Sequence, residues 1–217
     1  MAQPYYITTP IYYVNDKPHI GHAYTTLACD VLARFKRLDG FDVTFLTGTD
    51  EHGQKVEKAA YDKGLSSQSF TDEVSQNFRD LTAQMNFSNN DFIRTTEVRH
   101  KLACQEIWRR LQERGHIRLG NYAGWYSVRD EAFFTETEVV DGKAPTGAPV
   151  EWVEEPSYFF NLSQWQQPLL DYYDVNPDFV GPESRFNEVK SFVKGGLHDL
   201  SVSRASFKWG IPVPGDP

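Results

Sequence analysis

The hydrophobic and polar positions in the first half of the chain follow two different periods. A β-prone run at residues 5–8 ends at Pro10, and a polar loop leads to a helical period over residues 19–38. Apolar residues of this helix fall on one stripe: Ala23, Leu27, Val31, Phe35 and Leu38. A second, mostly apolar strand follows at residues 41–48. A strand–helix–strand unit with this spacing predicts two parallel, adjacent strands.

The alternation of helix and strand continues to Gly115. The pattern predicts helices at residues 54–63 and 67–85, a strand at residues 91–94 and a helix at residues 97–114. The expected buried side of the last helix consists of Val98, Leu102, Ile107, Trp108 and Leu111. Such alternation indicates an α/β fold in which helices cover a parallel sheet.

The pattern changes after Gly115. Residues 117–134 and 138–153 are rich in aromatic and β-branched residues, with turn signals at Gly120-Asn121 and Asp141-Gly142. Helices are expected near residues 163–173 and 185–194. The sequence therefore predicts a smaller β-rich unit with helices after the parallel sheet.

Composition and charge exclude several classes of protein. The 217 residues are 40% hydrophobic, enough for a packed core, and the net charge of −8 argues against binding nucleic acid by bulk electrostatics. The two cysteines, Cys29 and Cys104, lie in helical patterns and are expected to be small core residues rather than a disulfide. The chain has no apolar run of membrane-spanning length and begins without a leader, which favours a cytoplasmic protein with no membrane partner.

Two histidines at the start of the first helix are the leading candidates for chemistry. His19 and His22 share one face of the first turn, with Gly21 between them, at the helix end that attracts anions. The loops after the first two strands must open on the same sheet edge, so Asp50 and His52 are expected near this pair. The alternative interpretation is that the two histidines are surface residues at a helix start and that Asp50 is a solvated acid in a turn.

The longer strings resemble a known family. Residues 18–25, reading PHIGHAYT, resemble the HIGH motif of class I aminoacyl-tRNA synthetases, and residues 8–15, TTPIYYVN, resemble methionyl-tRNA synthetases. The TGTDEHG loop at residues 47–53 and residues 124–132, 152–160 and 203–212 extend the similarity over the whole chain.

The resemblance implies roles for individual residues. His19 and His22 would stabilise the transition state at the α-phosphate of ATP, and Gly21 would pack against adenine. Asp50 would bind the ammonium group of methionine. The other implied contacts are Ile11, Tyr13 and His52 for methionine and, more weakly, Arg204 near the active site. Mg²⁺ would accompany ATP as the substrate's counterion.

The resemblance also implies a domain plan and several departures from the family. Residues 1–115 would be the N-terminal half of a Rossmann catalytic domain, 116–200 a connective-peptide-like insertion and 201–217 a return segment towards a missing second half. No cysteine occurs between residues 105 and 217, so we predict no zinc knuckle and no zinc. The KMSKS string and the anticodon-reading helical domain are also absent, so tRNA(Met) would bind mainly through missing regions.

Three functions remain open from the sequence. The first is the N-terminal fragment of a methionine-tRNA ligase, impaired by itself. The second is a catalytically inactive, truncated module that binds nucleotide or tRNA. The third is another class I synthetase, against which the contexts of Tyr13 and Asp50 argue.

Overall fold

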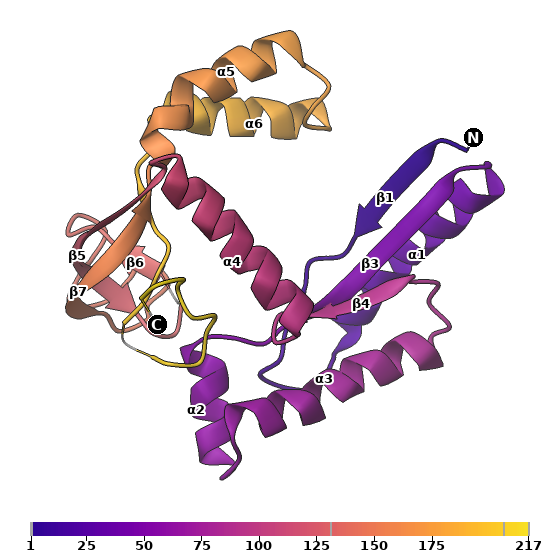
Figure 1. Ribbon diagram of the computed structural model, residues 1–217, viewed down its shortest axis with the longest axis horizontal. Helices are drawn as coiled ribbons and strands as arrows, with labels where there is room; N and C mark the ends of the chain where they lie inside the picture. Colours follow the sequence, from indigo (N-terminus) through magenta and orange to yellow (C-terminus); the bar gives the residue numbers. More distant parts are fainter. Residues whose placement is uncertain (1, 131, 206, 217) are drawn as a thin grey trace. The chain divides into compact units, whose positions relative to one another are not determined.

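The structure, a computed structural model, describes residues 2–130, 132–205 and 207–216 (Figure 1). It divides into two compact units, which we describe separately. Unit one comprises Met1–Gln105 and Phe207–Pro212, and unit two comprises Glu106–Ser206 and Val213–Pro217. Helix α4 (Val98–Glu113) begins in unit one and ends in unit two. The three domain ranges expected from the sequence were drawn from the resemblance to the family and not from how compactly the chain folds. They stay a prediction.

Unit one is built on a parallel sheet whose longest strand is β3 (Asp42–Asp50). Strand β1 (Pro4–Thr8) pairs with the first part of β3 and β2 (Tyr12–Tyr13) with its end, while β4 (Asp91–Arg94) pairs along the other side. The parallel, adjacent pairing of the first two predicted strands is confirmed. Strand β2 was not predicted, because two residues are too few to show a period.

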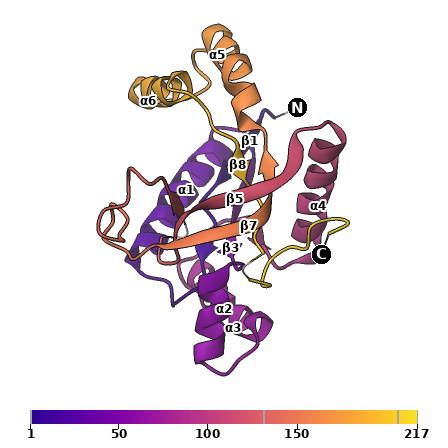
Figure 2. The ribbon, with the colours of Figure 1, turned by 90° about the vertical axis from the view of Figure 1, so that its left-hand side faces the viewer.

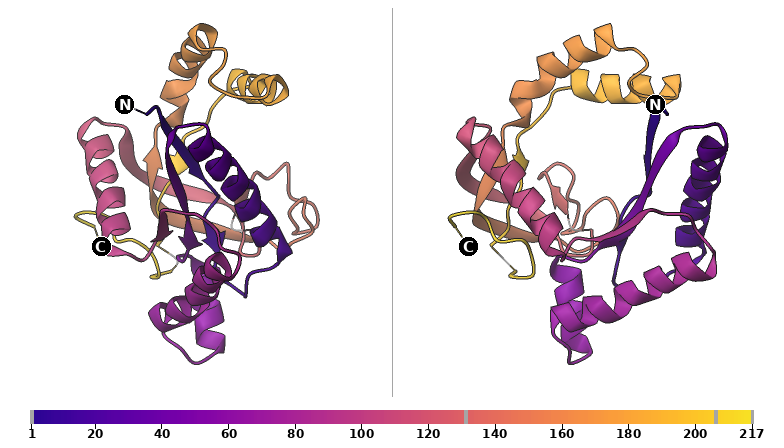
Figure 3. Two further views of the ribbon diagram at one scale, coloured as in Figure 1. Left: turned by 90° about the vertical axis from the view of Figure 1, so that its right-hand side faces the viewer. Right: turned by 45° about the vertical axis from the view of Figure 1, so that its right-hand side comes forward.

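Three helices of unit one were expected and are confirmed: α1 (Ile20–Leu38), α2 (Gln54–Asp62) and α3 (Ser67–Gln84). Helix α1 runs beside β1 and β3 (Figure 3) and packs on them around the buried Ala33, Val43 and Phe45. Helices α2 and α3 pack in a second cluster with β2 and β4. Its buried members are Tyr12, Val14, Val56, Ala60, Phe70, Val74, Phe78 and Phe92.

The apolar stripes expected on two helices do not form the core contacts. On α1, Val31, Phe35 and Leu38 are exposed, and the buried positions are Thr26, Asp30 and Ala33. The expected buried side of α4 is wrong for Val98, Leu102 and Ile107, which are 60% or more exposed. Periodicity shows that a helix has an apolar side, but it does not show which element covers that side. Cys29 and Cys104 are free thiols, as expected, and both are only half-buried; Cys29 packs against the cluster of Ala33, Val43 and Phe45.

Asp30 fastens α1 to the turn before β4. Its buried carboxylate accepts hydrogen bonds from the Ser88 backbone N–H (2.6 Å), the Ser88 hydroxyl (2.6 Å) and Arg34 Nε (2.7 Å). Burial alone would raise the pKa of Asp30, but the Ser88 and Arg34 hydrogen bonds outweigh it and lower the pKa. The ionised carboxylate therefore stabilises the fold at neutral pH.

We expect Asp30→Asn to lower the free energy of unfolding at pH 7 by about 1–3 kcal/mol, as for hydrogen bonds to a charged group. Because the folded pKa is lowered, this contribution is complete above the unfolded pKa of about 3.9 and is lost as the pH falls below it. Urea unfolding across this range should show the two proteins converging at low pH. Asp39→Asn, at an exposed residue after the same helix, is the control. An equal effect of both substitutions would contradict the prediction.

Unit two contains the β-rich segment expected from the sequence (Figure 2). Strands β5 (Ile117–Ser127) and β7 (Glu151–Phe160) form a long antiparallel ribbon, bordered by β6 (Ala132–Phe134) and β8 (Leu200–Ser201). After β7, a short 3-10 helix, η1 (Leu162–Trp165), leads into α5 (Gln166–Val175), and α6 (Glu183–Lys194) packs against α5. The predicted fold class, a parallel sheet with helices followed by an α+β unit, is confirmed.

Candidate active site

The first turn of α1 is closed by the two histidines. His19 is the N-cap residue, with extended backbone angles, and its Nδ1 accepts a hydrogen bond from the Gly21 backbone N–H (3.1 Å). In return, His22 Nδ1 accepts from the His19 backbone N–H (3.0 Å). The ring centroids lie 3.9 Å apart. This is a capping box in which imidazoles replace the usual hydroxyl and carboxylate.

The glycine between the histidines is required by their geometry. A Cβ at Gly21 would lie 2.9 Å from Cε1 and 3.1 Å from Nδ1 of the His19 ring. Any larger residue would push this ring away from the helix start. The absence of a side chain at Gly21 therefore leaves room for the His19 ring beside the first turn of α1.

His22 is the more buried of the pair. Its ring lies against Tyr12 (centroids 4.8 Å apart) and Phe78 (5.2 Å), and the Tyr12 hydroxyl is held by Thr26 at 2.7 Å. Burial, and next the neighbouring His19, lower the pKa of His22. The ring is therefore neutral at pH 7, and because Nδ1 accepts a backbone N–H, its proton lies on Nε2. The start of α1 thus offers a hydrogen-bond donor beside the positive end of the helix dipole.

Two other sequence-predicted residues meet at the end of the sheet. Tyr13 of β2 is the register partner of Asp50 in β3, and the Val14 backbone N–H donates to the Asp50 carbonyl (3.3 Å). Lys55 Nζ lies 5.9 Å from the Tyr13 ring centroid. Ile11, between β1 and β2, is 39% exposed and so is not an ordinary core residue. The strand end thus carries an aromatic and an acidic residue as register partners, with a lysine near the aromatic ring.

His52 follows Asp50 by two residues and has an unusual environment. Burial is the main cause that lowers its pKa to about 4, with Lys101 and His100 adding to the effect and Glu51 opposing it. Its Nε2 is buried and has no hydrogen-bond partner among the described residues. The ring lies 5.4 Å from that of Trp209. A neutral imidazole with an unused nitrogen is suited to hold a polar group of a small ligand.

Arg204 belongs to unit two, unlike the other predicted residues. Its Nη1 donates to Ser201 Oγ (2.8 Å) and to the Ser203 carbonyl (2.7 Å), so it is held within its own segment. The structure thus brings His19, Gly21 and His22 together at one helix start and Tyr13, Asp50 and His52 at the adjoining strand end. The functional role of every one of these residues remains a prediction.

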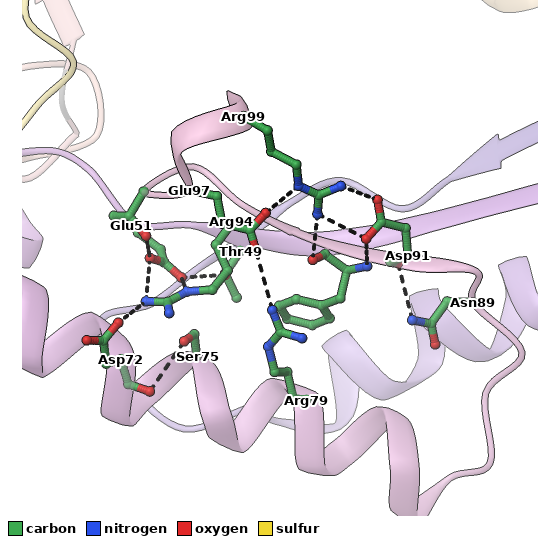
Figure 4. Close-up of polar contacts among 12 residues, drawn as sticks. Thr49, Glu51, Asp72, Ser75, Arg79, Asn89, Asp91, Arg94, Glu97 and Arg99 are labelled. Atoms are coloured by element: carbon green, nitrogen blue, oxygen red, sulfur yellow. Dashed lines mark hydrogen bonds and ion pairs between the residues drawn. The ribbon is translucent and has the colours of Figure 1, made fainter. Parts of the chain in front are cut away.

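Sequence reasoning did not identify the residues that support this loop. Glu51 is fully buried and forms an ion pair with Arg94, which lies at the end of β4 (Figure 4). Trp209 comes back from the far end of the chain and donates its indole N–H to the Glu51 carbonyl (2.5 Å). A four-residue strand that ends on an arginine is a weak signal, and only the three-dimensional arrangement joins these residues.

No group of three or more His, Cys, Asp or Glu side chains within the described ranges is arranged to hold a metal ion. The predicted lack of zinc stays a prediction. In the same ranges, no helix is long and apolar enough to cross a membrane.

Comparison with known proteins gives one family for the whole chain. The family described as tRNA synthetases class I (M) matches residues 5–151 and 144–217. Together with the parallel sheet and the histidine pair at the helix start, this match places the chain in the class I tRNA synthetases. The chain belongs to the methionine branch of that family, which confirms the resemblance noted in the sequence.

Individual relatives agree with this assignment. The methionine–tRNA ligase of Rickettsia conorii is 67% identical over 99% of the chain, and that of Listeria monocytogenes is 52% identical over 98%. The Mycobacterium tuberculosis methionyl-tRNA synthetase, solved in complex with methionyl-adenylate, is 53% identical over 99% of the chain, with a TM-score of 0.93. The chain spans 42% of the Rickettsia protein, 34% of the Listeria protein and 43% of the Mycobacterium chain.

Proposed function

We propose that this chain carries the N-terminal part of a methionine-tRNA ligase. In the proposed reaction, methionine and ATP form methionyl-adenylate and pyrophosphate, and the methionyl group is then transferred to tRNA(Met). The proposal is supported by family membership and by the relatives' names. It is further supported by the methionyl-adenylate that the similar Mycobacterium tuberculosis enzyme binds.

The observation that carries the proposal is the imidazole capping box. Nδ1 of His19 and Nδ1 of His22 each accept a backbone N–H, so Nε2 is the nitrogen of each ring that can donate to a ligand. The oxygen of the methionine carboxylate attacks the α-phosphorus of ATP, the bond to the bridging oxygen breaks, and pyrophosphate leaves. Negative charge grows on the phosphate oxygens in this step, and fixed donors at a helix start lower its barrier.

The adjoining strand end suits the amino acid. The Asp50 carboxylate would pair with the ammonium group, while Ile11 and Tyr13 would line a pocket for the flexible, polarisable thioether. His52, neutral at pH 7, would contact methionine through its unpartnered Nε2. Gly21 leaves room for the flat adenine ring beside His19.

The remaining partners follow from the same proposal. Mg²⁺ would accompany ATP, bound mainly through the phosphate oxygens, and would neutralise part of their charge. Arg204 is proposed as a further contact near the active site. Contact with tRNA(Met) would come mainly from parts of the relatives that this chain does not match, and a cytoplasmic location is part of the proposal.

A second candidate is a module that binds nucleotide or tRNA without catalysis. Such a module would use the same donors at the start of α1 to hold a phosphate, without a chemical step. A class I synthetase for another amino acid is a third reading, and the high identity to methionine enzymes argues against it.

The test is methionine-dependent exchange of radiolabelled pyrophosphate into ATP. It is run with the chain alone and with a fusion protein, in which the chain is joined to the part of the Rickettsia conorii ligase beyond the match. We expect exchange with methionine and not with leucine or isoleucine, at least in the fusion protein. Silence of both proteins, when circular dichroism shows them folded, would overturn the proposal in favour of the binding module.

A further inference from the structure

The buried carboxylate of Glu51 ties the ends of β3 and β4 together directly and reaches α3 through Arg94. Its Oε1 accepts from the Thr49 hydroxyl (2.7 Å) and from Arg94 Nε (2.7 Å), and its Oε2 accepts from Arg94 Nη2 (2.9 Å) and the Thr96 hydroxyl (2.5 Å). Arg94 continues to Asp72 of α3 at 2.6 Å (Figure 4). The ends of β3 and β4 are thereby tied to each other and to α3.

The backbone of Glu51 is fixed as completely as its side chain. Its N–H donates to the Thr95 hydroxyl (2.9 Å), and its carbonyl accepts from the Trp209 indole N–H (2.5 Å). The Trp209 carbonyl accepts in turn from the Gly53 backbone N–H (3.1 Å). Every polar group of Glu51 therefore has a hydrogen-bond partner, and these bonds restrain the loop from Asp50 to Gly53 at Glu51.

A buried ion pair such as Glu51–Arg94 is an inefficient way to stabilise a fold. Removing two charges from water costs several kcal/mol per ion, and apolar residues of similar volume often stabilise a core equally well. Here burial works against the charge of Arg94, but hydrogen bonds to Glu51 and Asp72 outweigh burial and raise its pKa. What a fully bonded carboxylate supplies, and an apolar side chain does not, is a fixed direction for the residues beside it.

We propose that Glu51 is a positioning residue for amino-acid recognition, acting with Arg94, Thr96 and Trp209. This inference rests on the proposed function, because it assumes that Asp50 and His52 contact methionine. Neighbouring residues of an extended chain point in opposite directions, so locking Glu51 inward holds Asp50 on the other side. Trp209 fixes the carbonyl just before His52 and lies against its ring.

The test separates recognition of methionine from recognition of ATP. In the fusion protein, Glu51→Gln keeps the shape of the side chain but removes the charge that Arg94 faces. We expect KM for methionine in pyrophosphate exchange to rise by roughly 10- to 100-fold, the scale of a small misplacement of binding groups. KM for ATP should stay unchanged, because the histidines at the start of α1 do not depend on this loop.

Glu97→Gln is the matched control. Glu97 lies in the same polar cluster and pairs with Arg79 (3.4 Å) and Arg99 (2.5 Å), but its side chain does not contact Glu51 (Figure 4). It should leave both KM values unchanged. A purely structural role of Glu51 would reduce the yield or the melting temperature and move neither KM, and that result would overturn the inference.

Two milder variants decide the matter if Glu51→Gln does not fold. Thr96→Val removes one hydrogen bond to Oε2, and Trp209→Phe removes the indole N–H while keeping a ring beside His52. A raised KM for methionine in either variant supports the inference, and unchanged values in both overturn it. Failure of the proposed function is distinct, since the unsubstituted fusion protein would then show no methionine-dependent exchange at all.

Discussion

His22→Ala is expected to lower kcat for methionine-dependent pyrophosphate exchange by about 100- to 1,000-fold in the fusion protein, the loss seen when one fixed donor to a developing oxyanion is removed. The His22 ring is held in place by the His19 N–H and by contacts with Tyr12 and Phe78. Because its Nε2–H is already oriented, no reorganisation is needed as charge grows on the phosphate. Alanine at position 22 removes this donor and leaves only that of His19.

The charge state of His22 adds a pH criterion. Burial and the neighbouring imidazole lower its pKa, so it is neutral at pH 7 and donates as an uncharged group. The His22-dependent part of the rate should therefore not fall as the pH is raised from 7 to 8, as it would if an imidazolium were required.

His198→Ala is the control for this prediction. His198 is exposed and belongs to unit two, so its removal should leave exchange unchanged. The His22 variant also loses an N-cap bond, worth about 0.5–2 kcal/mol, and thermal unfolding should confirm that it remains folded. A folded His22→Ala protein whose kcat is within a few-fold of the unsubstituted value would rule out the catalytic role.

The first turn of α1 was predictable because its signal is local. Strand, proline, loop and helix follow one another in the sequence, and a crossover of this length brings the two strands side by side. The prediction that Asp50 and His52 lie at the same sheet edge as the histidines depended only on this topology. Strand β2 was missed, although it pairs Tyr13 with Asp50, because a two-residue strand has no pattern.

The residues that hold the Asp50–Gly53 loop in place were not predictable, because their contacts join positions far apart in the sequence. Glu51 is 43 residues from Arg94 and 158 residues from Trp209. In the sequence it was only an acid near a helix start, where the dipole alone would favour it. Buried charge can be recognised only when the partners that satisfy it are known. The same limit applies to the exposed apolar stripe of α1, whose covering element cannot be read from the helix itself.

Gly48→Ala is expected to cause the largest loss of stability, about 3 kcal/mol or more, at the upper end of overpacking effects. Gly48 of β3 is paired with Ile93 of β4, and a Cβ there would lie 2.0 Å from the Ile93 carbonyl oxygen and 2.6 Å from its Cγ2. A backbone atom cannot rotate away, so the two strands would have to separate. Arg94 follows Ile93 directly, so the same movement would pull its guanidinium from Glu51 and disturb the loop beside Asp50.

Urea unfolding of the chain tests this prediction, with Gly210→Ala as the control. Apart from its two chain neighbours, no described residue has a heavy atom within 4 Å of a Cβ at Gly210. This glycine also lies in unit one, so the control should change stability by only about 0.5 kcal/mol. In the fusion protein, Gly48→Ala should in addition raise KM for methionine, since strand separation reaches Glu51 through Arg94. Equal unfolding midpoints for the two variants would mean that β3 and β4 can move apart without loss of stability. The proposed methionine site needs a rigid strand end, so this result would contradict its proposed structural basis.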